Sequence, residues 1–407
     1  MPYDLLSFLL LRTKKKANIQ FNRKLLTSLF IGQYNVEKTQ TPPPHQNPES
    51  ETTQKTNQRQ SGIELLRIVS MFLVLLLHSL YYSLGRPTAD DYANNGIEMV
   101  LRTEFEAISL VCVNVFVMIS GWFGIKIKIK RLAEFIYQWL FLAVLVVAVL
   151  LISGIRFPIG DYKYLIGSYQ FYWFIYAYLF LYILSPVLNY FINNSLQNDC
   201  KVVLVLYWIF MILFGWIQPL YYIKFGLSPI LFIGLYLTAR YLHVYRPRWS
   251  THGVKHDLTL FLILTSVSAM IMMLITCCSP SAHLVYKSYG MFMSYVNPLS
   301  VLASTYLLLA FSKIKFYSKV VNKVAASAFA VYLLHSNYAV FETYFTKVIN
   351  IIHIEYSGIL YPIITLSFLV AVFILSVLAD QLRIYSYAFI AKKAEKKLLN
   401  NGRIKNS

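Results

Sequence analysis

The sequence predicts an all-α polytopic membrane protein of about ten transmembrane helices, with its N-terminus and C-terminus cytoplasmic. Hydrophobic residues make up 57% of the 407 residues and charged residues only 14%, whereas soluble proteins carry roughly 25% charged residues. Apolar stretches long enough to cross a bilayer follow one another from residue 63 onward. Basic residues gather in alternate loops, as expected of a chain that crosses a membrane repeatedly.

The apolar stretches give the expected helices in order. Each is long enough to cross a hydrocarbon core about 30 Å thick, and several prolines lie in or beside them and are expected to kink or end helices. The ten expected spans are 63–83, 107–125, 132–153, 171–192, 201–217, 225–243, 258–278, 290–311, 324–345 and 359–382.

Charge supports this order and the orientation. With the N-terminus inside, 29 of the 37 Lys and Arg residues fall on the inner side and seven on the outer side. That bias fits an even number of crossings with both ends cytoplasmic. It also explains the formal charge of +19 without a nucleic-acid partner, because the charge is spread over many short loops.

Three regions follow from composition. Residues 1–60 are expected to form a basic, disordered cytoplasmic tail, residues 61–385 the ten-helix domain, and residues 386–407 a second basic cytoplasmic tail. The four cysteines show no metal-ligand spacing, so no metal site is expected and they are interpreted as packing residues.

The first span carries the most suggestive polar pattern. Glu64 and Arg67 stand near its start and His78 follows Arg67 by eleven residues. That separation leaves the two side chains roughly 20° apart on one helix face and about 16 Å apart along the axis. A cation near the cytosol can hold a donor phosphate, and a deeper imidazole can act on the transferred group. Alternatively, Arg67 snorkels to lipid headgroups and His78 makes one helix–helix hydrogen bond.

Later spans hold further candidates for lining an active site. Asn114 and Ser120 lie on the second span, Tyr176 in an aromatic cluster on the fourth, and Tyr332 and His335 on the ninth. Each also has a structural interpretation: small-residue packing for Ser120, an aromatic belt for Tyr176 and a satisfied buried imidazole for His335.

Four motifs together resemble the membrane acyltransferase family 3, whose members include stand-alone bacterial O-acetyltransferases of surface polysaccharides. The similarity covers about residues 61–385, and one departure is that no carboxylate stands in the Trp-Ser-Leu…Glu region that some members carry on the fourth helix. The matching segments are Glu64-Leu65-Leu66-Arg67 through His78, Val115–Phe123, Trp173–Tyr178 through Ser185-Pro186 to Asn189, and Tyr332-Leu333-Leu334-His335.

The resemblance implies a donor, an acceptor and roles for these residues. The donor is acetyl-coenzyme A (acetyl-CoA) from the cytosol, and the acceptor is a hydroxyl of a polysaccharide or lipid-linked sugar, reached from across the cytoplasmic membrane. His78 is then the catalytic imidazole and Arg67 assists donor binding. From their charge alone, Arg131 and Arg240 in inner basic segments are further candidates to contact the donor phosphates. Alternatively, such segments, which also hold Arg246, only set topology.

Other interpretations stay open at this point. A transporter or flippase for a polysaccharide or lipid-linked sugar also needs many helices and intramembrane polar groups, although no internal repeat is visible here. The acceptor sugar, the nature of the acyl group, direct transfer as against an acyl-imidazole intermediate, and the oligomeric state are not determined by the sequence.

Overall fold

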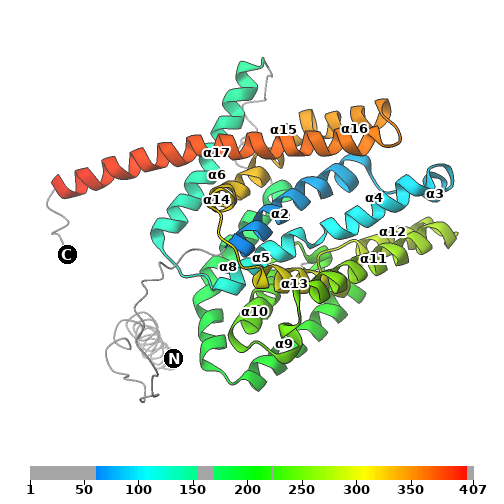
Figure 1. The fold of residues 1–407 in the computed structure, drawn as a ribbon, viewed down its shortest axis with the longest axis horizontal. Helices are drawn as coiled ribbons and strands as arrows, with labels where there is room; N and C mark the ends of the chain where they lie inside the picture. Colours follow the sequence, from blue (N-terminus) through cyan, green and yellow to red (C-terminus); the bar gives the residue numbers. More distant parts are fainter. Residues whose placement is uncertain (1–60, 155–168, 222, 401–407) are drawn as a thin grey trace, which may run out of the picture. The chain divides into compact units, whose positions relative to one another are not determined.

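The described part of the chain is helical. The computed structural model describes residues 61–154, 169–221 and 223–400, and no strand occurs among them (Figure 1). The predicted tail 1–60 lies outside these residues. Helix formation follows from sequence, because long apolar runs in lipid must satisfy their backbone hydrogen bonds internally.

Seven helical segments in the described ranges are long and apolar enough to span a membrane. They match seven of the ten expected spans to within a few residues, except that the second begins earlier and the last ends later than expected. The segments are Ser61–Tyr82, Gly96–Phe123, Ile129–Ile152, Tyr172–Asn194, Gln197–Ile217, Val254–Cys278 and Leu360–Lys393. The protein is therefore a multi-pass membrane protein.

The other three expected spans correspond to shorter or bent helices. Helix α10 (Pro229–Tyr245) has 17 residues and α13 (Pro298–Lys313) has 16. Both begin at a proline, a residue that favours the first helical turn and prevents extension backward. Helix α14 (Lys319–His335) breaks before the segment Tyr338–Glu355, with a bend of 68°; counting this pair as one span gives up to eight. The total of ten spans and the side of each terminus stay predictions.

The last helix is longer than expected. Helix α17 (Leu360–Asn400) continues well past residue 382, so part of the predicted C-terminal tail is helical. It packs against α6 (Ile129–Ile152) and α14 (Figure 1). Asp380 is fully buried there, bonded by Arg383 at 2.8 and 2.9 Å and by Gln138 of α6 at 2.9 Å. A buried carboxylate requires such partners.

Helix α2 (Ser61–Leu77) lies among several neighbours rather than at the lipid boundary. It packs against α14, α13, α4 (Gly96–Ser109) and α5 (Val111–Phe123) (Figure 1). About 61% of its span is buried and 72% of the α4–α5 span, as against 22–33% for the other five spans. The candidate residues of the first two spans therefore project into protein.

The described ranges also hold two π-helical turns, η3 (Ile212–Ile217) and η6 (Phe341–Phe345), and two 3-10 turns, η4 (Lys224–Gly226) and η5 (Arg248–Thr251). The remaining α-helices complete the described bundle. They are α3 (Ala89–Asn94), α8 (Tyr169–Asn194), α9 (Gln197–Met211), α11 (Val254–Cys278), α12 (Ala282–Phe292), α15 (Tyr338–Val340) and α16 (Thr346–Glu355). A short π-helical turn, η2 (His78–Tyr82), continues α2 directly. Such turns are frequent at functional sites, and this one begins at His78.

Candidate functional site

Two histidines from distant parts of the chain meet inside the bundle. Nδ1 of His78 lies 2.9 Å from Nε2 of His335, at the end of α14. Nδ1 of His335 bonds the carbonyl oxygen of Val331; because a carbonyl only accepts, that nitrogen carries the proton. In a neutral ring, Nε2 of His335 is then an acceptor. His78 therefore donates from Nδ1 and keeps its Nε2 unprotonated.

The surroundings of His78 are aromatic. Rings of Tyr82 and Phe341 meet His78 edge-on at centroid distances of 5.0 and 5.5 Å. A cavity of about 30 Å³ lies beside His78, comparable to the volume of one water molecule in the liquid. The predicted candidate Tyr332 also lines it. Its full lining is Met71, Val74, His78, Val113, Phe116, Trp173, Phe174, Tyr295, Phe329 and Tyr332.

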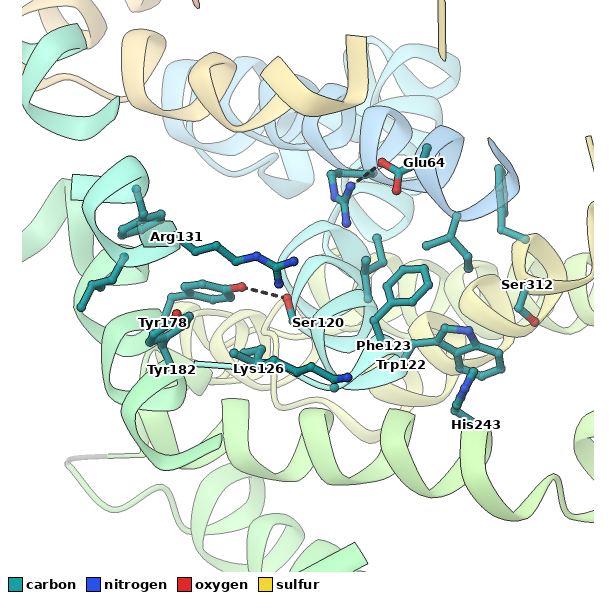
Figure 2. A pocket seen from close by; sticks show the side chains of 18 of the residues that line it. Glu64, Ser120, Trp122, Phe123, Lys126, Arg131, Tyr178, Tyr182, His243 and Ser312 are labelled. Carbon is teal, nitrogen blue, oxygen red and sulfur yellow. Dashed lines mark hydrogen bonds and ion pairs between the residues drawn. The ribbon is translucent and has the colours of Figure 1, made fainter. Parts of the chain in front are cut away.

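A much larger cavity lies at the opposite end of α2, with a volume of about 830 Å³. We call it the basic cavity. Figure 2 shows Arg131 and Lys126 reaching into it beside Ser120 and Tyr178, with Glu64 across from them. Its polar and charged lining residues are Glu64, Arg67, Ser120, Lys126, Arg131, Tyr178, Tyr182, His243, Arg246 and Ser312.

Cations dominate the basic cavity. Arg67, Lys126, Arg131 and Arg246 contribute four positive charges, and Glu64 is the one carboxylate among its lining residues. Glu64 pairs with Arg67 across one helical turn. The remaining positive charge suits a ligand with several anionic groups, since guanidinium and ammonium groups bind phosphate strongly.

Two predicted residues near the basic cavity are already engaged with protein groups. Ser120 lies 3.1 Å from the hydroxyl of Tyr178, and the histidine pair does not bond it. Arg240 is not among the lining residues and donates weakly to the carbonyl of Trp122 and to Asn193 Oδ1, at 3.5 and 3.4 Å. Of the two predicted arginines, Arg131 lines the basic cavity and Arg240 does not.

Two further predicted residues, Asn114 and Tyr176, line neither the basic cavity nor the small cavity at His78. Asn114 is fully buried and donates at 2.9 Å to the carbonyl of Tyr295, joining α5 to the segment before α13. Tyr176 is 39% exposed and meets the ring of Trp139 edge-on. The structure therefore places neither of them in a cavity with Arg67 or His78.

Phenylalanine rings separate the basic cavity from His78. A cavity of about 210 Å³ shares Arg67 and Tyr178 with the basic cavity. It also shares Phe116, Phe174 and Phe329 with the small cavity at His78. These three rings contact one another at centroid distances of 5.7 to 6.0 Å. We call them the phenylalanine cluster; it stands between Arg67 and the imidazole.

A fourth cavity, of about 450 Å³, lies at the His78 end of α2 and includes Leu77 of that helix. We call it the tyrosine cavity. Tyr295 lines both this cavity and the small cavity at His78. Its polar, charged and aromatic lining is Tyr81, Tyr82, Arg86, Glu106, Trp216, Phe225, His283, Tyr286, Lys287, Tyr289, Ser294 and Tyr295.

Sequence reasoning did not single out several of these residues. Lys126 and Arg246 stand in inner basic segments, a pattern that also indicates nothing beyond membrane topology. Glu106 is one of five acidic residues within residues 84–106, and no motif distinguishes it from the others. The phenylalanine cluster had no distinguishing signal, because three rings cannot be selected among 28 Phe residues without packing information.

Comparison with known proteins gives one match. A family model described as an acyltransferase domain matches residues 60–380, which include both ends of α2 and the histidine pair. No curated protein and no solved structure matches the chain.

Proposed function

The chain belongs to the membrane acyltransferase family 3, and from that premise we propose that it acetylates a sugar. The donor is cytosolic acetyl-CoA, and the acceptor is a hydroxyl of a cell-surface polysaccharide or lipid-linked sugar at the cytoplasmic membrane. Family membership supports an acyltransferase. The donor, the acceptor and the roles of His78 and Arg67 are those that the family resemblance implies, and the geometry of the cavities is consistent with them.

The observation that carries the proposal is the histidine pair. His335 holds the Nδ1 proton of His78 in a fixed direction, so Nε2 of His78 is available as a base. A base that removes a proton during attack typically accelerates a reaction by about 10²–10⁴-fold. His78 therefore has an unprotonated Nε2 and is surrounded by the aromatic rings of Tyr82 and Phe341.

The proposed reaction is a single acyl transfer. Nε2 of His78 removes the proton of the acceptor hydroxyl while that oxygen attacks the thioester carbonyl carbon. The carbon–sulfur bond breaks, and the imidazolium returns its proton to the leaving thiolate, which gives the acetyl ester and coenzyme A. An acyl-imidazole at the same Nε2 is the two-step variant of this chemistry.

The basic cavity supports binding of the donor. Arg67, Lys126 and Arg131 surround a volume of about 830 Å³, enough for a ligand with several phosphate groups. From there the long pantetheine arm of coenzyme A is directed along α2. To bring the thioester to His78 it has to part the phenylalanine cluster, which stands between the basic cavity and the imidazole.

The test is release of coenzyme A thiol by the purified full-length protein with acetyl-CoA and a candidate acceptor. We expect His78→Ala to lower kcat by about 10²–10⁴-fold, with the KM for acetyl-CoA little changed. His353→Ala is the matched control, since His353 is 35% exposed and lines none of the four cavities. Retention of most activity by His78→Ala would refute the assignment, and a transporter would release no thiol in any variant.

A further inference from the structure

The tyrosine cavity has the position of an acceptor site. It lies at the end of α2 opposite the basic cavity, so a molecule bound there does not compete with the donor. Two of its tyrosines connect it to the surroundings of His78. Tyr82 lines the cavity and meets the His78 ring at 5.0 Å, and Tyr295 lines both the tyrosine cavity and the small cavity at His78.

A buried carboxylate in this cavity lacks part of its hydrogen bonding. Glu106 is only 1% exposed and its Oε1 accepts from the hydroxyl of Tyr289. Its Oε2 is buried and has no hydrogen-bond partner among the described residues. An unsatisfied buried acceptor is costly. Since Glu106 lines the cavity, a hydroxyl of a bound molecule is the natural donor to Oε2.

Cations lie on another part of the same lining. The guanidinium of Arg86 stacks over the ring of Tyr286 at 4.5 Å and approaches that of Tyr289 at 5.6 Å. Stacking leaves the in-plane N–H groups of Arg86 able to donate. Lys287 also lines the cavity, and neither cation forms an ion pair with a described residue.

We propose that the tyrosine cavity binds the acceptor and selects a sugar that carries an anionic group. Glu106 Oε2 accepts a hydrogen bond from a sugar hydroxyl, the tyrosine rings cover the sugar faces, and Arg86 with Lys287 binds a carboxylate or phosphate. This inference rests on the proposed function, because a bound sugar is an acceptor only if the protein transfers an acyl group. Binding of the sugar does not itself require the reaction.

Binding is tested first, without acetyl-CoA. The probes are galactose, galacturonic acid and galactose 6-phosphate, which share a ring and differ at one carbon. The signal is fluorescence of Trp216, which lines the cavity, with Trp216→Phe to assign the change. We expect both anionic sugars to bind more tightly than galactose by about tenfold or more. A preference for one of the two identifies the anion as carboxylate or phosphate.

Variants then test the residues. Arg86→Gln should remove the advantage of the anionic sugars and leave galactose binding nearly unchanged, whereas Glu106→Gln should weaken all three. Lys347→Gln is the control, an exposed cation that is not part of the cavity lining. Equal binding of all three sugars, no binding of any, or an equal effect of Arg86→Gln on each would overturn the inference.

The outcome is separable from the proposed function. If the anionic sugars bind as described and no thiol is released in the presence of acetyl-CoA, the acyl transfer proposal fails and the binding site stands. If thiol release requires His78 but does not change with Arg86→Gln or with the charge of the sugar, the acyl transfer proposal stands and the proposed acceptor site fails.

Discussion

At the residue scale, the important feature is a hydrogen bond that fixes a tautomer. His335 is 1% exposed and its Nδ1 is committed to its own helix through the carbonyl of Val331. Its Nε2 is therefore the ring nitrogen that accepts the hydrogen bond from His78. The hydroxyl oxygen of Ser336 lies 3.3 Å from the same nitrogen. In the proposed reaction His335 is a positioning residue: it orients the imidazole of His78, as a histidine's partner commonly determines which nitrogen is protonated.

The role of His335 is testable through kinetics. Loss of a hydrogen bond that becomes charge-assisted when His78 gains a proton costs roughly 1.5–3 kcal/mol, which corresponds to about 10–100-fold in rate. We expect His335→Ala to lower kcat by that factor and to leave the KM for acetyl-CoA unchanged, as measured by thiol release. His335→Gln should recover part of the loss, because its amide oxygen can accept from His78. A loss of donor affinity with kcat unchanged would contradict the positioning role of His335.

At the element scale, close helix contacts determine where the site residues lie. An added Cβ at Gly62 would stand 2.2 Å from the carbonyl oxygen of Ile314, and one at Gly121 2.4 Å from that of Tyr236. Glycine therefore allows α2 to approach the end of α13, and α5 to approach α10. The first contact sets the height of Arg67 in the basic cavity, since Arg67 lies little more than one turn after Gly62.

Alanine at Gly62 should destabilise the protein although alanine favours helix. Overpacking of this kind costs about 1–3 kcal/mol, against a helix-propensity gain of up to about 1 kcal/mol. We expect a lower thermal unfolding midpoint for Gly62→Ala in detergent micelles. Gly96→Ala, where nothing lies within 4 Å of an added Cβ, should be neutral or slightly stabilising. Equal midpoints for the two variants would show that α2 moves freely against α13.

At the scale of the whole molecule, two large cavities occupy opposite ends of α2. The basic cavity includes Ile63 and Arg67 from its beginning, and the tyrosine cavity includes Leu77 from its end and Tyr81 from the turn η2 that continues it. The phenylalanine cluster and the histidine pair lie between them. This arrangement suits a reaction whose two substrates approach from opposite sides of a membrane.

Sidedness can be measured by labelling single cysteines with a membrane-impermeant maleimide. Cys277 and Cys278 are exposed and are first replaced by serine, while Cys112 and Cys200 are buried. In that background, Lys287→Cys in the tyrosine cavity should react in intact cells. Lys126→Cys in the basic cavity should react only after permeabilisation. Labelling of both from one side, or the reverse pattern, would contradict the predicted topology.

Much of this protein was determined by its sequence alone. Hydropathy and charge bias established a helical membrane protein, and motif order pointed to the acyltransferase family and to Arg67 and His78. Those signals are local, since each depends on residues within one helix or loop. The tertiary structure decided that His78 meets His335, 257 residues away, and that Arg131 but not Arg240 lines the basic cavity. It also decided which three phenylalanines separate Arg67 from His78. Such contacts depend on how helix faces pack, which local periodicity does not encode.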